Sequence, residues 1–182
     1  SDTFHGYRPF IDLLGGEFQT HGAQVQVQAY NQDPTFPSNR HLGESWVIFD
    51  EIYEFKSFYR PKVHGLLTLD KHPQTLVPGD FPVAWCKRLG DGPKAGRIWY
   101  TSLGHREDVW TSSTYQRHIL GGIQWTLGVV DAPAKPGGNS FLASVGCGWT
   151  SASTLSSAVC GSGRDRNGTL NPPLLALQLA VA

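Results

Sequence analysis

Residues 97–110 read RIWYTSLGHREDVW, and this stretch shows where an apolar strand ends. Its β-branched and aromatic beginning favours an extended conformation, which Gly104 ends. His105 and Glu107 follow directly. Two positions apart on an extended chain, they would share one face, so that Glu107 could orient His105 as a general base. The same residues also suit an ordinary polar loop, and both interpretations stay open at this point.

Apolar runs bounded by Gly, Pro or Asp recur along the chain and predict a central sheet. Those at 62–70, 81–88 and 96–104 are apolar at successive positions, which is typical of strands buried on both faces. Residues 24–29, QVQVQA, alternate instead, which predicts a strand with one solvated face. Residues 44–55, ESWVIFDEIYEF, are expected to be extended because they are rich in aromatic and β-branched side chains.

Two segments have helical spacing. Residues 7–14, YRPFIDLL, carry a proline where a first turn tolerates it, and Gly15-Gly16 would stop the helix. Residues 111–128 begin with Thr and Ser, which can cap a helix, and repeat apolar side chains at helical intervals up to a final glycine. The pair Gly121-Gly122 inside this helix costs about 1 kcal/mol per glycine relative to alanine, which predicts close packing against another element.

Charge and length limit the classes of partner. The 182 residues hold 15 basic and 15 acidic side chains, and no basic stripe appears, which argues against nucleic acid or an anionic membrane surface. Small neutral ligands remain. The apolar last residues have about half the length needed to cross a bilayer, so no membrane span is expected. We expect a domain over residues 1–136 and a Gly/Ser-rich, low-complexity, disordered tail over residues 137–182.

Three cysteines without Cys-x-x-Cys spacing indicate neither a zinc site nor a disulfide framework. Cys86 lies inside an apolar run and is expected to be a buried thiol. A bridge between Cys147 and Cys160 would require export. The chain opens without a charged-then-apolar leader, the odd number of cysteines favours a reducing compartment only slightly, and localisation is left open.

Several blocks, taken in order, resemble the ThuA-like (trehalose utilisation) family. They are DTFHGYRPFIDLLGGEFQTHG, DEIYEF, VHGLLTLD, DFPVAWCKRLGDGPKAGRIWYTSLGHREDVW and HILGGIQWTLG, and they cover residues 2 to about 130. The resemblance implies an α/β fold of the class I glutamine-amidotransferase-like type, a flavodoxin-like parallel sheet with helices on both sides. It also implies that strand–helix units usually found before the DTF block are missing, so we expect an N-terminally truncated domain. Its unpaired sheet edge makes a homo-oligomer a further expectation.

The resemblance also implies a site at the carboxyl ends of the strands. A late His-x-Glu, here His105 and Glu107, would complete a catalytic pair, whereas ThuA-like proteins generally lack the nucleophilic cysteine of the amidotransferases. The DEIY block is characteristic of the family. It makes Asp50, Glu51 and Tyr53 candidates for contact with a carbohydrate, because carboxylates accept hydrogen bonds from sugar hydroxyls.

Three further residues are expected near the same pocket. His5 and His21 flank the first helix, and Trp110, next to the His105 loop, is the tryptophan expected to stack on a sugar ring. Histidines and carboxylates together could ligate a metal, but no His-x-x-x-His or comparable spacing supports one, and neither a metal nor a cofactor is expected.

The resulting hypothesis is a protein of carbohydrate utilisation that acts on trehalose or a related disaccharide by acid–base or hydrolytic chemistry. A non-catalytic saccharide-binding or accessory module is the first alternative, and a non-functional fragment of a ThuA-like protein is the second. Saccharide binding that survives a His105→Ala substitution, without turnover, would favour the first alternative.

Overall fold

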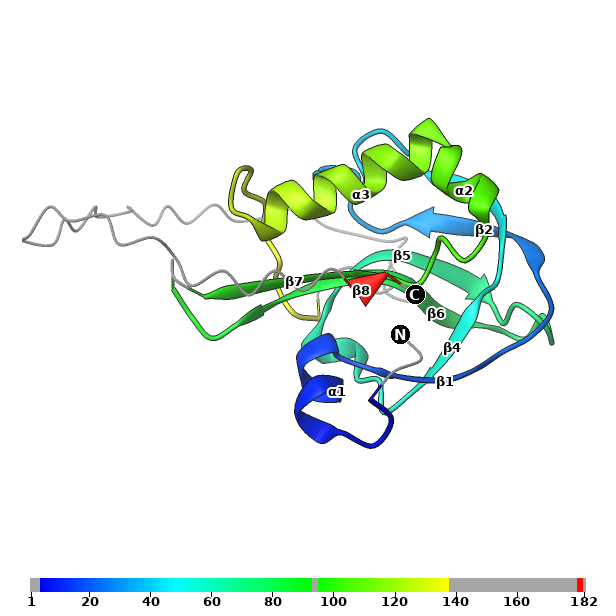
Figure 1. Ribbon diagram of the computed structural model, residues 1–182, viewed down its shortest axis with the longest axis horizontal. Helices are drawn as coiled ribbons and strands as arrows, with labels where there is room; N and C mark the ends of the chain where they lie inside the picture. The colour runs from blue at the N-terminus through cyan, green and yellow to red at the C-terminus, as the bar shows by residue number, and fades with distance from the viewer. Residues whose placement is uncertain (1–3, 93–94, 138–179, 182) are drawn as a thin grey trace, which may run out of the picture.

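The computed structural model describes residues 4–92, 95–137 and 180–181 (Figure 1). The predicted tail, with Cys147 and Cys160, lies outside the described residues apart from one short strand. The elements, in chain order, are α1 (Arg8–Leu14), β1 (Glu17–His21), β2 (Val25–Asn31), β3 (Ser45–Asp50), β4 (Tyr53–Lys56), the 3-10 turn η1 (Arg60–Lys62), β5 (His64–Lys71), β6 (Pro78–Leu89), β7 (Gly96–Thr101), α2 (Glu107–Thr111), α3 (Ser113–Thr126) and β8 (Ala180–Val181).

A six-stranded sheet with the order β3-β2-β5-β6-β7-β8 forms the centre of the molecule, and β1 and β4 form a separate two-stranded ribbon. Every pair in the large sheet is antiparallel except β7 with β8. The expected parallel direction is therefore not found among β2, β3, β5, β6 and β7. A tight connection such as residues 72–77 explains this, because a parallel crossover needs a dozen or more residues.

The sheet separates two apolar clusters. Trp99 belongs to the larger cluster, which includes residues of α3, whereas its neighbour Tyr100 packs with Trp85 and with Leu14 of α1. The Trp85 and Tyr100 rings stack with centroids 4.4 Å apart. Figure 1 shows α2 and α3 on one side of the sheet and α1 on the other. The α/β class with flanking helices and the burial of β5, β6 and β7 on both faces are confirmed.

Helix α3 packs closely against other elements at its paired glycines, as predicted. A Cβ at Gly121 would lie 2.4 Å from the carbonyl oxygen of Pro37, and one at Gly122 would lie 2.3 Å from the ring of Trp99. The expected side-chain cap is not formed: Ser112 precedes the helix without a capping hydrogen bond from its hydroxyl. Close packing, and not a side-chain cap, therefore holds this helix in place.

The segment 44–55 is not one extended run. It splits into β3, which pairs with β2 in the large sheet, and β4, which pairs with β1 in the ribbon. Ile52, at the break, is 1% exposed and belongs to the larger apolar cluster. Because the chain changes sheets here, Glu51 lies between the two sheets. In the part of the chain that the structure describes, no helix has the length and apolar character needed to span a membrane.

Candidate functional site

The carboxylate of Glu51 lies between two histidines from distant segments. Its Oε2 is 3.2 Å from Nδ1 of His105, and its Oε1 is 3.4 Å from Nδ1 of His21. The Glu51 side chain is 11% exposed, whereas those of His21 and His105 are 39% and 43% exposed. A mostly buried carboxylate thus supports two imidazoles that solvent can reach. Sequence analysis singled out all three residues separately, and the fold brings them together.

Contacts at Nδ1 define the orientation of both imidazoles. Nδ1 of His21 also lies 2.9 Å from the carbonyl oxygen of Gly22, so this nitrogen faces two acceptors and carries a proton. Nδ1 of His105 faces the Glu51 carboxylate at ion-pair distance, which favours a proton on this nitrogen. Among the described residues, neither Nε2 atom has a hydrogen-bond partner. Whichever of the two rings is neutral therefore presents an unshared electron pair on Nε2.

Asp50 connects two segments of the site through hydrogen bonds. Its carboxylate is fully buried and accepts hydrogen bonds from the backbone N–H groups of Gly104 (2.6 Å), Glu51 (2.9 Å) and Arg106 (3.2 Å). These bonds tie the end of β3 to the loop that carries His105. The Asp50 oxygens are thus occupied by backbone donors and lie away from the surface, and contact of Asp50 with a ligand stays a prediction.

Two aromatic residues also stabilise the His105 loop by donating hydrogen bonds to its backbone. The hydroxyl of Tyr115 donates to the carbonyl oxygen of Leu103 (2.7 Å), and the indole N–H of Trp110 donates to that of Gly104 (2.8 Å). Gly104 has a φ of 103°, and a Cβ there would lie 2.0 Å from the Tyr115 hydroxyl, so only glycine fits. Trp110 is 42% exposed, and its stacking on a sugar stays a prediction.

Glu107 belongs to a different element from His105. It begins helix α2 and is exposed, so the two-residue alternation of an extended chain does not apply to it. Among the described residues, no hydrogen bond or ion pair joins it to His105, and Glu51 takes the place expected for it. An open depression lies beside His105, lined by Gln24, His105, Arg106, Glu107 and Asp108.

The remaining two predicted residues have different positions. Tyr53 is opposite His21 in the β1–β4 ladder, with ring centroids 5.8 Å apart, and it packs edge-on against Phe18. It therefore supports the His21 side of the cluster. Nδ1 of His5 lies 3.4 Å from a different carboxylate, that of Glu17. Glu17 and His21 are at opposite ends of β1, so His5 is not part of the Glu51 cluster.

Two other kinds of chemistry have little support in the described residues. The Cys86 thiol is fully buried, as predicted, and burial raises its pKa well above the ordinary range, so it is a poor nucleophile. Within residues 4–92 and 95–137, no group of three or more His, Cys, Asp or Glu side chains is arranged to hold a metal ion.

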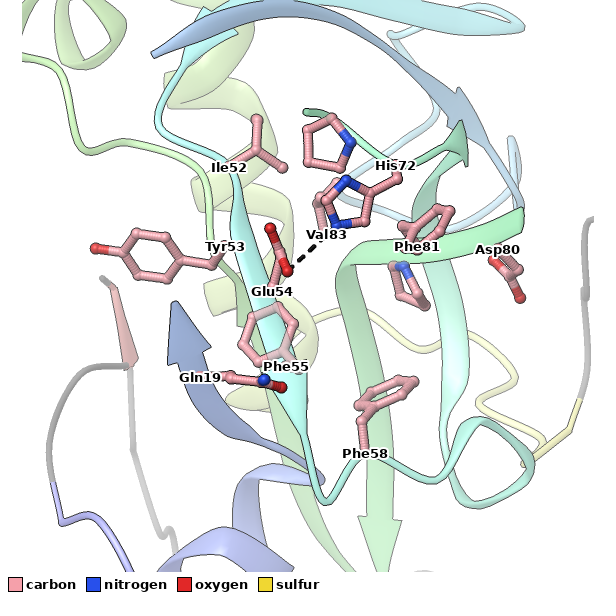
Figure 2. Close-up of a pocket in the computed structure, with 12 residues that line it drawn as sticks. Gln19, Ile52, Tyr53, Glu54, Phe55, Phe58, His72, Asp80, Phe81 and Val83 are labelled. Atoms are coloured by element: carbon pink, nitrogen blue, oxygen red, sulfur yellow. Dashed lines mark ion pairs between the residues drawn. The ribbon is translucent and has the colours of Figure 1, made fainter. Parts of the chain in front are cut away.

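A pocket behind β4 was not predicted from the sequence. Figure 2 shows Tyr53 pointing away from this pocket, whereas Glu54 points toward His72. Nε2 of His72 is 3.2 Å from Oε2 of Glu54. The alternation of side chains along a strand could have indicated that Glu54 faces opposite to Tyr53, but its partner lies across a turn that sequence alone does not position.

Comparison with known proteins identifies relatives of this chain. The family described as ThuA, trehalose utilisation, matches residues 2–126. The crystal structure of a ThuA-like protein from Bacteroides uniformis matches with a TM-score of 0.55 and 20% identity, covering 70% of this chain and 54% of the other. A ThuA-like protein from Parabacteroides merdae matches with a TM-score of 0.46 and 23% identity, covering 62% and 40%. This chain thus spans about half the length of the first structure. The comparison with curated proteins finds no match.

Proposed function

We propose that this chain, which belongs to the ThuA (trehalose utilisation) family, acts on trehalose or a related disaccharide, with His105 as the group that moves a proton. The Glu51 carboxylate held between His21 and His105 is the observation that carries the proposal. Nothing in this arrangement requires the cysteine nucleophile of an amidotransferase. The proposed chemistry is acid–base chemistry at a sugar hydroxyl or glycosidic oxygen.

The orientation of His105 suits a general base. Its Nδ1–H group points to Glu51, and its Nε2 electron pair can accept a proton from a substrate hydroxyl. The imidazolium that forms is stabilised by the carboxylate, which is screened little because it is mostly buried. The single negative charge of Glu51 balances one imidazolium. We therefore assign opposite roles to the two histidines, so that when His105 is the base, a protonated His21 is the acid.

The surroundings of His105 suit a hydroxylated ligand. The open depression beside it offers the amide of Gln24 and the exposed carboxylate of Glu107, which can bind sugar hydroxyls. Arg106 is already engaged, with its guanidinium 2.8 Å from Oδ1 of Asp108 and 2.8 Å from Oε1 of Gln24. In this proposal Glu107 binds substrate, and Asp50 is a positioning residue that acts through the loop.

The openness of the depression favours one alternative, a saccharide-binding module without chemistry, because a catalytic site usually excludes water more fully. Turnover and binding must therefore be measured separately. Trehalose and related disaccharides are incubated with wild type, with His105→Gln and with the control variant His41→Gln, and products are followed by mass spectrometry. His41 is a suitable control because its Nε2 binds the carbonyl oxygen of Thr114 rather than the Glu51 carboxylate.

We expect turnover by wild type and by His41→Gln, and a kcat at least about 100-fold lower for His105→Gln, with KM changed much less. Equal rates for wild type and His105→Gln would contradict the assignment of His105. Sugar binding that His105→Gln leaves unchanged, without turnover in any variant, would support the binding module instead. If the protein neither binds nor turns over any disaccharide, both functions are overturned.

A further inference from the structure

We call the pocket behind β4 the aromatic pocket (Figure 2). It encloses about 180 Å³ between β4, β6 and the turn after β5. Its lining includes three phenylalanines, one carboxylate and one imidazole that could contact a ligand: Phe55, Phe58, Phe81, Glu54 and His72. We propose that this pocket binds a small organic ammonium ion, independently of the Glu51 cluster.

The phenylalanine rings form a supported aromatic wall. Phe55 and Phe58 each pack edge-on against the buried Trp85, with ring centroids 5.1 and 4.8 Å apart. Phe81 packs edge-on against His72, with centroids 5.3 Å apart. All three phenylalanines are half-buried, so part of each ring stays accessible. Aromatic faces carry negative charge density and attract cations, most strongly when the cation is out of water.

The Glu54 carboxylate adds a full negative charge. Its neighbour His72 does not neutralise it, because Nδ1 of His72 accepts hydrogen bonds from the backbone N–H groups of Gln74 (3.2 Å) and Thr75 (3.1 Å). Nδ1 is therefore unprotonated, and Nε2 carries the single proton that faces Oε2 of Glu54, 3.2 Å away. A neutral imidazole thus orients the carboxylate and leaves its charge in place.

The second carboxylate of the lining is already balanced. Asp80 forms an ion pair with Nε of Arg60 (3.1 Å) and accepts a short hydrogen bond from the hydroxyl of Thr68. Among the described residues that line the aromatic pocket, none is lysine or arginine. The pocket therefore has a net negative charge, which comes from Glu54.

These features together select the class of ligand. A sugar ring would leave most of its hydroxyl groups without partners against phenylalanine, which is costly in a desolvated site. A neutral apolar molecule would leave the Glu54 charge partly desolvated and unpaired. An ammonium ion that carries methyl groups satisfies both parts of the pocket, since its apolar surface packs on the rings while its charge faces the carboxylate.

The test uses the whole chain and tetramethylammonium chloride as the probe, titrated against matched sodium chloride and followed by NMR. We expect saturable shifts of the backbone amides of residues 52–55, Asp80, Phe81 and Val83. Glu54→Gln should weaken the Kd about tenfold, and Phe81→Leu should weaken it severalfold. The exposed carboxylate of Glu44 provides the matched control, and Glu44→Gln should leave the Kd unchanged. Neutral tert-butanol should bind more weakly and respond little to Glu54→Gln.

Four results would overturn the proposal: no saturable shifts, an unchanged Kd in Glu54→Gln, an unchanged Kd in Phe81→Leu, or equal binding of tert-butanol by wild type. Glu54→Gln keeps an acceptor for the proton on Nε2 of His72, so the native fold should persist, and a near-UV spectrum checks it. If that variant unfolds, Phe81→Leu and the wild-type comparison of the two probes decide the question.

Discussion

The buried histidine of α3 makes stability depend on pH in a window that the structure fixes. His118 is fully buried, and its Nδ1–H group donates to the carbonyl oxygen of Ser38, 3.0 Å away. Among the described residues, its Nε2 has no hydrogen-bond partner, and its ring packs edge-on against Trp99. Burial lowers the pKa of His118 to about 4. The folded protein therefore keeps this imidazole neutral at pH values where the unfolded chain protonates it.

The direction and size of the effect follow from linkage. With an ordinary pKa of about 6.5 in the unfolded chain, His118 takes up a proton on unfolding once the pH falls below that value. Stability is therefore complete above about pH 6.5 and falls as the pH approaches 4. Between about pH 7 and pH 5 this group alone lowers the free energy of unfolding by about 2 kcal/mol.

Urea unfolding at several pH values, for wild type and His118→Asn, measures this contribution. The asparagine amide can still donate to the Ser38 carbonyl, but it does not titrate. We expect the variant to be less stable than wild type at neutral pH, because it fills the site less well, and the difference to shrink by about 2 kcal/mol toward pH 5. Parallel pH dependence of the two proteins, or an NMR titration of His118 near pH 6.5, would refute the reasoning.

Three further predictions concern contacts elsewhere. Hydrogen bonding from His64 lowers the pKa of Asp33 to about 2. Asp33→Asn should therefore lower the unfolding free energy near pH 7 by about 1 to 2 kcal/mol, allowing for partial screening, and this loss should vanish as the pH falls from about 3.8 toward 2. Gly121→Ala should lower stability by about 1 to 3 kcal/mol in denaturant unfolding despite the better helix propensity of alanine, since the Pro37 backbone cannot move aside; equal stability would contradict the close packing. Asp50→Ala should speed amide exchange at Gly104 and Arg106 by about tenfold or more, and unchanged protection would show that other groups hold the loop.

Local patterns predicted most elements of the fold. The alternation of Val25, Val27 and Ala29 with glutamines matches a strand that buries one face, and Gly15, with a φ of 96°, ends the first helix as expected. Gly121 lies where close packing was predicted. Each of these features depends on neighbours within one helix or strand, which is why the sequence reveals them.

Features that depend on distant contacts could not be predicted. The break between β3 and β4 follows a residue, Asp50, whose partners Gly104 and Arg106 are more than fifty positions away. The pairing of Glu51 with His105 depends on the same contacts. The helix that begins at Glu107 was not predicted either, because a helix of five residues has no periodic pattern to show it.

In the proposed function, Glu51 presents two imidazoles to a saccharide, and NMR of the histidine side chains during a trehalose titration can detect this contact. We predict saturable shifts of the His21 and His105 imidazole signals with no shift for His118, and a loss of the response in Glu51→Gln. A titration in which trehalose binds while the signals of His21 and His105 stay unchanged, or one in which Glu51→Gln responds like wild type, would contradict the claim.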